Sequence, residues 1–389
     1  MSQHYPYESP VEAACVEMDA ERLHKVVKTF LKQQVKGQFP GGQLCVRRFG
    51  QVALNVSCGI ARGWHGRGGD KPVEVKGNTP FAVYSTGKPM AAILVALLEA
   101  RGLIDIQDPV CKYLPEFASL GREEITVVDV LTHKAGIILT DLIHLPHLVA
   151  DREAAWQHLL KTKPLYPRGT FAYMPTEYGM ILDQLILNIT GKTATTLFET
   201  ELVQPLGLNN ISYGLGQRNL NELGWAYWLG KPSYKVVDMD VAEGFEEKNN
   251  SHAVFSAANP AISMVADAAN LAALYEFLVQ GGQTQQGEHY MDANLLGRYT
   301  RKQVAGYNKS IKTYLSFGHG FMLGTLLPSF FGWWGTQTCF GHPGMFSSFA
   351  FADHKTKLAI AIVTNGNAGI GDFFNRMVPL VHNIRKSCN

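Results

Sequence analysis

The chain has 389 residues, of which 46% are hydrophobic and 17% charged, and its formal net charge at pH 7 is +2. This length and composition are typical of a globular enzyme with a large core divided into two domains or subdomains. The small net charge and the lack of a long Lys/Arg block argue against a nucleic-acid partner. We therefore expect the partner to be a small molecule.

The first ten residues do not place a positive segment before an apolar one, so they do not predict a secretory signal. No run approaches the roughly twenty apolar residues that a membrane span needs. Six cysteines lack the spacing of metal ligands, which predicts reduced thiols in a chain without an export signal. They are Cys15, Cys45, Cys58, Cys111, Cys339 and Cys388. We expect a cytoplasmic protein.

The N-terminal part reads as a helix followed by a hairpin. Apolar residues recur at three- and four-residue steps between residues 19 and 36, which predicts an amphipathic helix. Strand-like runs at 43–48 and 51–60 flank Phe49-Gly50 and predict an antiparallel hairpin. The glycine-rich stretch 61–78 lacks the helix and the Lys-Ser/Thr pair of a phosphate loop, so we expect a surface loop there.

The middle of the chain is predicted to be mostly helical from about residue 85 to 250. Besides the helix that begins near Lys88, helical patterns cover 153–161, 177–189 and 195–202. A further helix is expected at 268–279, strands at 320–326, 347–351 and 357–363, and a terminal helix at 373–385.

Strands at both ends with helices between them imply an α/β (α+β) fold with one sheet built from both chain ends. We expect residues 1–80 and 255–389 to form the α/β subdomain. Residues 81–254 would form an inserted, mostly helical subdomain.

One stretch carries a candidate nucleophile. Ser85 follows the turn-rich segment 77–80 and precedes Lys88 by three residues, at the start of a helix that is apolar on nearly every side. Residues three apart share a helix face, so the Lys88 amine can reach the Ser85 hydroxyl and act as its base. The free N–H groups of the first turn can contribute to an oxyanion hole. Because about one Ser-x-x-Lys arises by chance in such a chain, an N-cap serine beside a surface lysine is the alternative.

Several ordered motifs along the chain resemble the serine beta-lactamase and penicillin-binding-protein superfamily, closest to its class C and family VIII carboxylesterase-like branch. They are 81–88, 103–117, 125–136, 167–173, 191–193, 205–208, 341–344 and 364–366. The resemblance covers the chain from about residue 20 to its end. It implies an antiparallel sheet flanked by helices, an active site between the helical subdomain and the sheet edge, and chemistry without a cofactor.

The first motif of that superfamily matches Ser85 and Lys88, and the second, a tyrosine followed two residues later by asparagine, reads Tyr173-Met174-Pro175. The resemblance implies that Tyr173 shares a proton with Lys88, and which of the two is the base stays open. A buried structural tyrosine is the competing interpretation, and Tyr178 is a possible substitute. Pro175 departs from the pattern, since it has no amide to bind the acylamino group of a substrate.

The third motif, commonly Lys-Thr-Gly, is here His342-Pro343-Gly344. The resemblance implies that Gly344 allows close approach of a substrate and that the N–H of Met345 joins that of Ser85 in the oxyanion hole. A mostly neutral His342 and a Pro343 without a hydroxyl cannot grip a substrate carboxylate as Lys and Thr do. An ester is therefore favoured over a β-lactam or a D-peptide.

Aromatic residues crowd the approach to the third motif, and they either line a substrate pocket or belong to the core. They are Phe330, Phe331, Trp333, Trp334, Phe340 and Phe346. His144 and His147 near Asp141 lack a third ligand at helical spacing, so we predict no metal site. For His133 a structural hydrogen bond is favoured over catalysis, and for Trp225 and Trp228 packing is favoured over sugar binding.

Together these observations predict a serine hydrolase that forms an acyl-enzyme on Ser85, most simply a carboxylesterase acting on small or medium apolar esters. An acyltransferase would use the same acyl-enzyme with another acceptor. An amidase, a D-aminopeptidase or a weak beta-lactamase is disfavoured by Pro175. A non-catalytic relative that binds through the same cleft is the alternative from another class.

Overall fold

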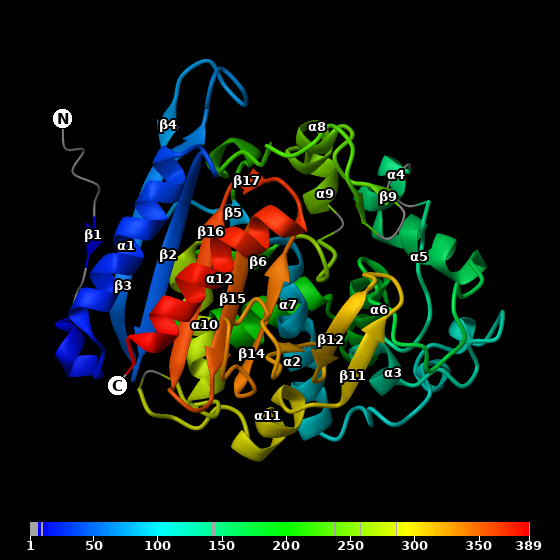
Figure 1. The fold of residues 1–389 in the computed structure, drawn as a ribbon. Coiled ribbons are helices and arrows are strands. Elements are labelled where there is room, and N and C mark those ends of the chain that lie inside the picture. The colour runs from blue at the N-terminus through cyan, green and yellow to red at the C-terminus, as the bar shows by residue number, and fades with distance from the viewer. Residues whose placement is uncertain are drawn as a thin grey trace.

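A computed structural model describes residues 7–8, 11–141, 145–236, 239–256, 258–284 and 286–388. Its centre is a ten-stranded sheet in the order β1-β3-β2-β16-β15-β14-β13-β12-β11, with β4 added to β3 and every pair antiparallel (Figure 1). The strands are β1 (Tyr7–Glu8), β2 (Gly41–Arg48), β3 (Gln51–Arg62), β4 (Val73–Glu74), β11 (Val304–Asn308), β12 (Thr313–Phe317), β13 (Met322–Leu323), β14 (Cys339–Gly344), β15 (Ser348–Asp353) and β16 (Leu358–Thr364). The pairing of β2 with β16 joins the two ends of the chain.

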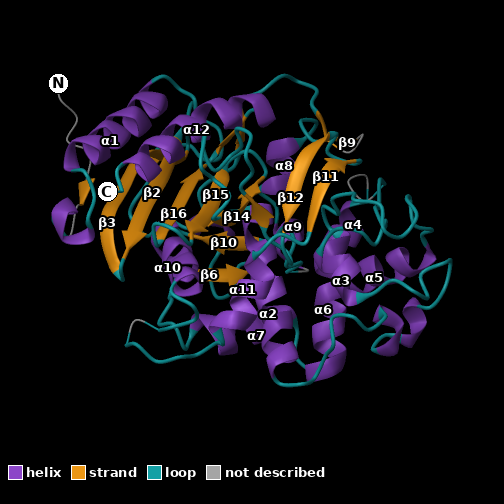
Figure 2. Ribbon diagram, turned by 60° about the horizontal axis from the view of Figure 1, so that its bottom comes forward, coloured by secondary structure: helices purple, strands orange, loops and turns teal. Residues whose placement is uncertain are grey.

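Helices cover both faces of this sheet, and alternate side chains of each strand point to opposite faces. On β16, Ile360 and Ile362 pack in one apolar cluster with α1 (Ala20–Val35) and α12 (Ile370–Lys386). The alternate residues Ala359 and Ala361 pack in a second cluster with α10 (Ala268–Val279). Figure 2 shows α1 and α12 on one face of the sheet and α10 on the other.

The second apolar cluster continues into the helical part of the molecule around α2 (Lys88–Ala100). Every residue of α2 from Lys88 to Leu98 is buried, as its nearly continuous apolar sequence requires. The helix packs against α6 (Glu177–Thr190), α7 (Ala194–Phe198) and α11 (Ala293–Thr300). Its first turn therefore emerges from the centre of the protein rather than from its surface.

Smaller elements surround that first turn. A three-stranded sheet in the order β5-β10-β6 lies beside it, and β7 pairs in parallel with β17. The remaining elements are β5 (Phe81–Ala82), β6 (Ile211–Tyr213), β7 (Tyr227–Trp228), β8 (Lys235–Val236), β9 (Met239–Asp240), β10 (Met264–Ala266), β17 (Gly366–Asn367), α3 (Val127–Leu131), α4 (Pro146–Ala150), α5 (Arg152–Lys161), α8 (Phe245–Asn249) and α9 (His252–Ser256), with 3₁₀ turns at Ala13–Val16, Tyr84–Gly87, Val110–Lys112, Pro115–Phe117 and Leu220–Glu222 and a π-helical turn at Glu199–Val203.

The predicted fold class is confirmed, and most predicted helices and strands lie within a few residues of the observed ones. Among the strands of five residues or more, three were missed: β11, β12 and β14. Strand β14 contains Gly341, Pro343 and Gly344, residues that are depleted in strands and typical of turns. The strand expected at 320–326 is only Met322–Leu323. The division of the chain at residues 80/81 and 254/255 stays a prediction.

Two general expectations can be compared with the structure. All six cysteines are free thiols, and Cys45, Cys58 and Cys339 are buried. Within the ranges that the structure describes, no helix combines the length and the apolarity that crossing a bilayer requires.

Candidate active site

Ser85 lies in the 3₁₀ turn that links β5 to α2, and hydrogen bonds fix the residues before it. The Val83 N–H donates to the Met264 carbonyl (2.9 Å), and the Ser348 hydroxyl donates to the Val83 carbonyl (2.8 Å). Tyr84 has a φ of +50°, a conformation that costs energy for a bulky residue. Such strain persists only where the surroundings impose it, and it is found most often at functional sites.

The Lys88 amine is enclosed by three oxygen atoms. Its Nζ lies 2.9 Å from Ser85 Oγ, 2.7 Å from the Pro175 carbonyl and 2.8 Å from the Ala261 carbonyl. The side chain is fully buried, and this burial holds the pKa of Lys88 well below its usual value. A neutral amine has two N–H groups and one lone pair. If the two carbonyls take the N–H groups, the lone pair faces the Ser85 hydroxyl and can accept its proton.

A buried carboxyl group near Lys88 was not expected from the sequence. Glu177, the first residue of α6, accepts hydrogen bonds from the Leu139 N–H (2.7 Å) and the Thr176 hydroxyl (2.9 Å). Burial raises the pKa of Glu177, and these hydrogen bonds partly oppose the rise. Its charge raises the pKa of Lys88 and so opposes the larger effect of burial there. The only sequence signal was an acidic residue at a helix start, which is common.

Tyr173 lies against the same amine, with Lys88 Nζ 5.1 Å from the centre of its ring. Burial raises the pKa of the Tyr173 phenol above its usual value, while a hydrogen bond with Ser85 opposes this rise. Its N–H donates to Asn308 Oδ1 (3.1 Å), and its carbonyl accepts from the Ser310 hydroxyl (2.9 Å). The phenol is therefore held in place and is neutral at pH 7.

Two neutral histidines flank the Tyr173 ring, with ring centres 4.7 Å away for His133 and 5.8 Å away for His342. Burial lowers the pKa of His133 well below its usual value, and Nδ1 of His133 accepts from the Met174 N–H (3.2 Å). This is the structural hydrogen bond expected for it. Burial, aided by the charge of Lys88, lowers the pKa of His342 to about 3. The third motif thus carries no positive charge at neutral pH.

Gly344 approaches another part of the molecule closely, and whether it also allows close approach of a substrate stays a prediction. A Cβ at Gly344 would lie 2.0 Å from the Val83 carbonyl oxygen, so the glycine lets β14 pack on the nucleophile segment. The next residue, Met345, has a φ of +33°. Among the described residues, no backbone or side-chain acceptor engages the N–H of Ser85 or Met345, so both groups are free to bind an oxyanion.

Ser85 opens into a cavity of about 320 Å³ whose wall is mostly apolar. Of the residues singled out from the sequence, Ser85, Tyr173, Pro175, His342, Pro343, Met345, Phe330 and Phe346 line it. The other lining residues are Tyr84, Leu139, Val149, Thr176, Val236, Val241, Lys248, Asn249, Ser251, Ala253, Val254, Ile262, Ile311, Thr313, Leu315, Met322, Ile370 and Phe373. Among the described lining residues, Lys248 is the sole lysine, arginine or carboxylate, and its Nζ donates to the Glu243 carbonyl (2.9 Å).

Two predicted pocket residues do not line this cavity. Trp333 packs its ring against Phe374, with ring centres 5.9 Å apart. Trp334 is 66% exposed, and its carbonyl accepts a hydrogen bond from Arg385 (3.0 Å). Their closeness to the third motif in the sequence misled the prediction, because the loop before β14 turns away from the cavity. Phe331 and Phe340 belong to the core.

The histidine pair considered as a metal site is not open to description: His144 lies outside the described residues, and so does the side chain of His147. Asp141 Oδ1 forms a hydrogen bond with His158 Nε2 (3.2 Å), which also lies 3.0 Å from Oδ2. Over the part of the chain that the structure covers, no three His, Cys, Asp or Glu side chains come together as metal ligands would.

A serine and a phenol lie here beside a buried amine and free N–H groups, an arrangement that can support nucleophilic catalysis. The chain belongs to the beta-lactamase family, whose family model matches residues 23–376. The predicted resemblance to the serine beta-lactamase and penicillin-binding-protein superfamily is thereby confirmed.

Individual relatives agree with this assignment. The chain is 27% identical over 370 residues to the esterase/beta-lactamase LipL of Mycobacterium tuberculosis, covering 88% of this chain and 81% of that protein. A penicillin-binding-protein homologue from Caulobacter crescentus has a similar structure, with a TM-score of 0.79, 26% identity and coverage of 95% and 98%. A family VIII carboxylesterase has the same fold, with a TM-score of 0.78, 23% identity and coverage of 95% and 98%.

Proposed function

We propose that this protein is a carboxylesterase that hydrolyses small or medium apolar esters through an acyl-enzyme on Ser85. One observation carries the proposal: Ser85, hydrogen-bonded to the buried Lys88 amine, opens into an apolar cavity. The third motif adds no positive charge to this cavity, because His342 is neutral. An apolar ester fits such a wall, whereas a substrate carboxylate at the third motif would lose its hydration there without gaining an ion pair from His342.

In the proposed reaction, Ser85 Oγ attacks the ester carbonyl carbon while the neutral Lys88 amine accepts the hydroxyl proton. The N–H groups of Ser85 and Met345 hold the negative oxygen of the tetrahedral intermediate. Its collapse breaks the bond to the leaving alkoxide, which takes the proton from the Lys88 ammonium and leaves an alcohol. Water then attacks the acyl-enzyme with Lys88 again as the base, releasing the acid and restoring Ser85.

The environment of the two candidate bases favours Lys88 over Tyr173. Burial lowers the pKa of the amine and raises that of the phenol, so at neutral pH the amine reaches its basic form more readily. A neutral His342 provides no cation that would stabilise a tyrosinate. The phenol, hydrogen-bonded with Ser85, then acts as a donor that orients Oγ or relays its proton.

The second and third motifs favour an ester over a β-lactam or a D-peptide. Pro175 presents no side-chain amide, and its carbonyl already accepts from Lys88. Pro343 lines the cavity without a hydroxyl. A cavity of about 320 Å³ lies at the small end of the range typical of ligand pockets, which supports an acyl group of short to medium length.

The proposal is tested by incubating wild-type protein and Ser85→Ala with p-nitrophenyl esters from acetate to octanoate and with a cephalosporin. We expect turnover of the esters and a transient acyl adduct in the intact mass of the wild type alone. Efficient cephalosporin hydrolysis would contradict the substrate class. Ester hydrolysis by Ser85→Ala at the wild-type rate would exclude Ser85 as the nucleophile.

A further inference from the structure

One side of the cavity is built by a segment whose own helices are too short to hold it. Residues 241–256, here called the variable wall, contain α8 and α9, each of five residues. Isolated helices of this length are unstable in water, so tertiary contacts must set the position of the segment. It contributes Val241, Lys248, Asn249, Ser251, Ala253 and Val254 to the cavity.

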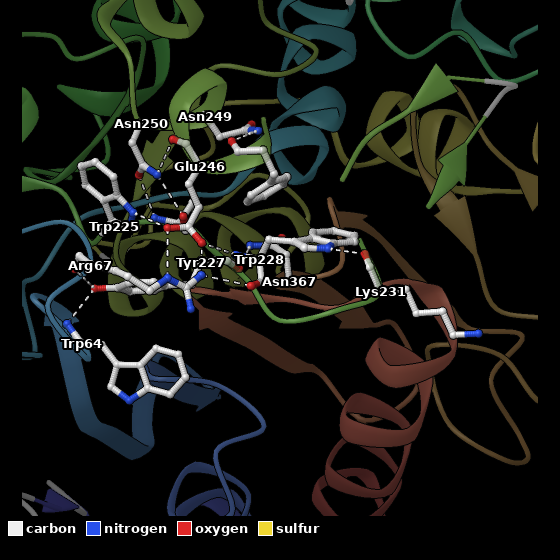
Figure 3. A network of polar contacts seen from close by, with 12 residues as sticks. Trp64, Arg67, Trp225, Tyr227, Trp228, Lys231, Glu246, Asn249, Asn250 and Asn367 are labelled. Carbon is white, nitrogen blue, oxygen red and sulfur yellow. Dashed lines mark hydrogen bonds and ion pairs between the residues drawn. The ribbon is translucent and has the colours of Figure 1, made fainter. Parts of the chain in front are cut away.

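Glu246 of α8 is the main polar anchor of the variable wall (Figure 3). Its carboxylate forms a two-point ion pair with Arg67, in which Arg67 Nε lies 3.3 Å from Oε2 and Nη2 contacts Oε1. It also accepts from the indole N–H of Trp225 (3.2 Å) and from the backbone N–H of Trp228 (3.1 Å). A carboxylate with four donors in a fixed geometry is a stronger tie than an ordinary surface ion pair.

Arg67 is held in turn by strand β7 and by aromatic rings. Its Nη2 donates to the Trp228 carbonyl (3.0 Å), and its guanidinium lies 5.2 Å from the ring centre of Tyr227 and 5.6 Å from that of Trp64. The adjacent Gly68, at φ +74°, has no room for a Cβ, which would lie 2.5 Å from the Trp225 ring. The loop that carries Arg67 is therefore fitted to this network rather than free on the surface.

The network is continuous with the central sheet. Asn250 Oδ1 accepts from the Ala226 N–H (2.8 Å), and its Nδ2 donates to the Ala226 carbonyl (2.9 Å). The N–H of Tyr227 donates to the carbonyl of Asn365, which directly follows β16 (2.8 Å). The Asn365 side chain accepts from Gly41 of β2 (2.8 Å). A path of hydrogen bonds thus runs from the sheet to the cavity wall.

We propose that the variable wall determines the acyl chain length that the cavity accepts, and that Glu246 and Arg67 are positioning residues that set the reach of this wall. The inference rests on the proposed esterase function. The pair has no role in the reaction itself, because neither residue lines the cavity. Releasing it lets α8 and α9 move outward and admits longer chains.

The test is the variant Glu246→Gln, which removes the charge and keeps the shape. We expect the ratio of kcat/KM for p-nitrophenyl octanoate to that for the acetate to rise at least about fivefold, since each methylene in a pocket is worth a factor of this order or more. The change should appear mainly in the KM for the long ester. A ratio within twofold of the wild-type value would overturn the proposal.

Glu201→Gln is a matched control. Glu201 pairs through both oxygens with Arg101 and accepts from the Tyr290 hydroxyl (3.2 Å), but this pair lies away from the cavity lining. Its side chain is about as exposed as that of Glu246, 17% against 24%. The chain-length ratio should be unchanged in this variant. An equal shift in both variants would mean that general loosening, not the wall, is responsible.

A second readout separates this inference from the esterase proposal. Alkyl fluorophosphonates of two to eight carbons label a reactive serine without needing turnover of the adduct, and intact mass reports the rate. If no ester is hydrolysed, the function proposal fails, while a changed chain-length profile of Ser85 labelling in Glu246→Gln still supports the wall. If the chain-length profile of labelling and the melting curve of Glu246→Gln both equal those of the wild type, the proposal about the wall is rejected.

Discussion

The floor of the cavity and its variable wall are built by opposite means. The floor is Ser85, in the turn directly before α2, and the residues of this helix from Lys88 to Leu98 are all buried in the apolar core. The wall, residues 241–256, has short helices held by a partly exposed carboxylate, two indoles and a guanidinium. Continuous apolar packing therefore surrounds the proposed reacting groups, whereas a polar network, together with the buried rings of Phe245 and Phe255, holds the surface that meets the substrate.

The difference follows from what each region must do. A base at neutral pH requires an amine with a lowered pKa, and burial is the means of lowering it, so Lys88 has to lie in the core. The contacting surface needs only a defined position. Polar contacts on short segments supply this at a small cost in core stability, and substitutions there change little else. We therefore expect changes in the two regions to have separable effects.

The largest effect should come from the floor itself. Ser85→Ala removes the proposed nucleophile, and kcat/KM for p-nitrophenyl esters should fall by about 10⁴-fold or more, as for other serine hydrolases. Intact-mass analysis should show no acyl adduct. Substantial remaining activity would contradict the assignment of the reaction to the cavity floor, because the reaction would not then depend on Ser85.

Replacing the two candidate bases, Lys88 and Tyr173, should show which of them accepts the proton of Ser85. Lys88→Met is expected to lower kcat by about 10²- to 10⁴-fold, the usual range for a general base, and Tyr173→Phe by about tenfold. Lys88→Arg should be as inactive as Lys88→Met, because a guanidinium stays protonated and cannot accept the proton. Steady-state kinetics decides the order. A larger loss in Tyr173→Phe would assign the base to the phenol.

Stability should separate the two regions as activity does. Leu94→Ala in α2 leaves a cavity at a fully buried site and should lower the free energy of unfolding by about 2–5 kcal/mol. Val254→Ala in the wall removes partly buried methyl groups, and its loss should be about 1 kcal/mol. Urea denaturation measures both. In contrast, only Val254→Ala should change the relative KM for short and long esters.

The pH profile is expected to show the smallest effect, about tenfold per pH unit. The active form has a neutral Lys88, so kcat/KM should rise with pH below the pKa of Lys88 and level off above it. Because the pKa of Tyr173 is raised and that of His342 is about 3, neither should add a second limb between pH 5 and 9. Glu177→Gln removes a charge that favours the ammonium, so the rising limb should shift to lower pH. A shift in the opposite direction would contradict this electrostatic assignment.

Much of the fold and the contact between Ser85 and Lys88 could be predicted because their sequence signals are local. The spacing of Ser85 and Lys88, and the apolar residues around α2, lie within one stretch of the chain. The hairpin of β2 and β3 and the helices α1, α6, α10 and α12 likewise have clear periodicities. Whether Tyr173 acts in the reaction stays a prediction, but its place beside Lys88 followed from family resemblance alone.

The rest could not be predicted because it depends on contacts distant in sequence or on the backbone. The Ala261 carbonyl that binds Lys88 has no side-chain signature. Arg67 and Glu246 are 179 positions apart, and neither residue is unusual in its own segment. Strand β14 contains His342-Pro343-Gly344, whose composition is typical of a turn, and it becomes a strand through its pairing with β13 and β15.

The pairing of β2 with β16 has a consequence for how the molecule forms. The hairpin made early in translation has an open edge until the last part of the chain is available, and Asn365 and its partners cannot form before then. Closing so long a connection is slow and entropically costly. Newly made chains should therefore stay inactive, and prone to association through that open edge, until β16 has been synthesised.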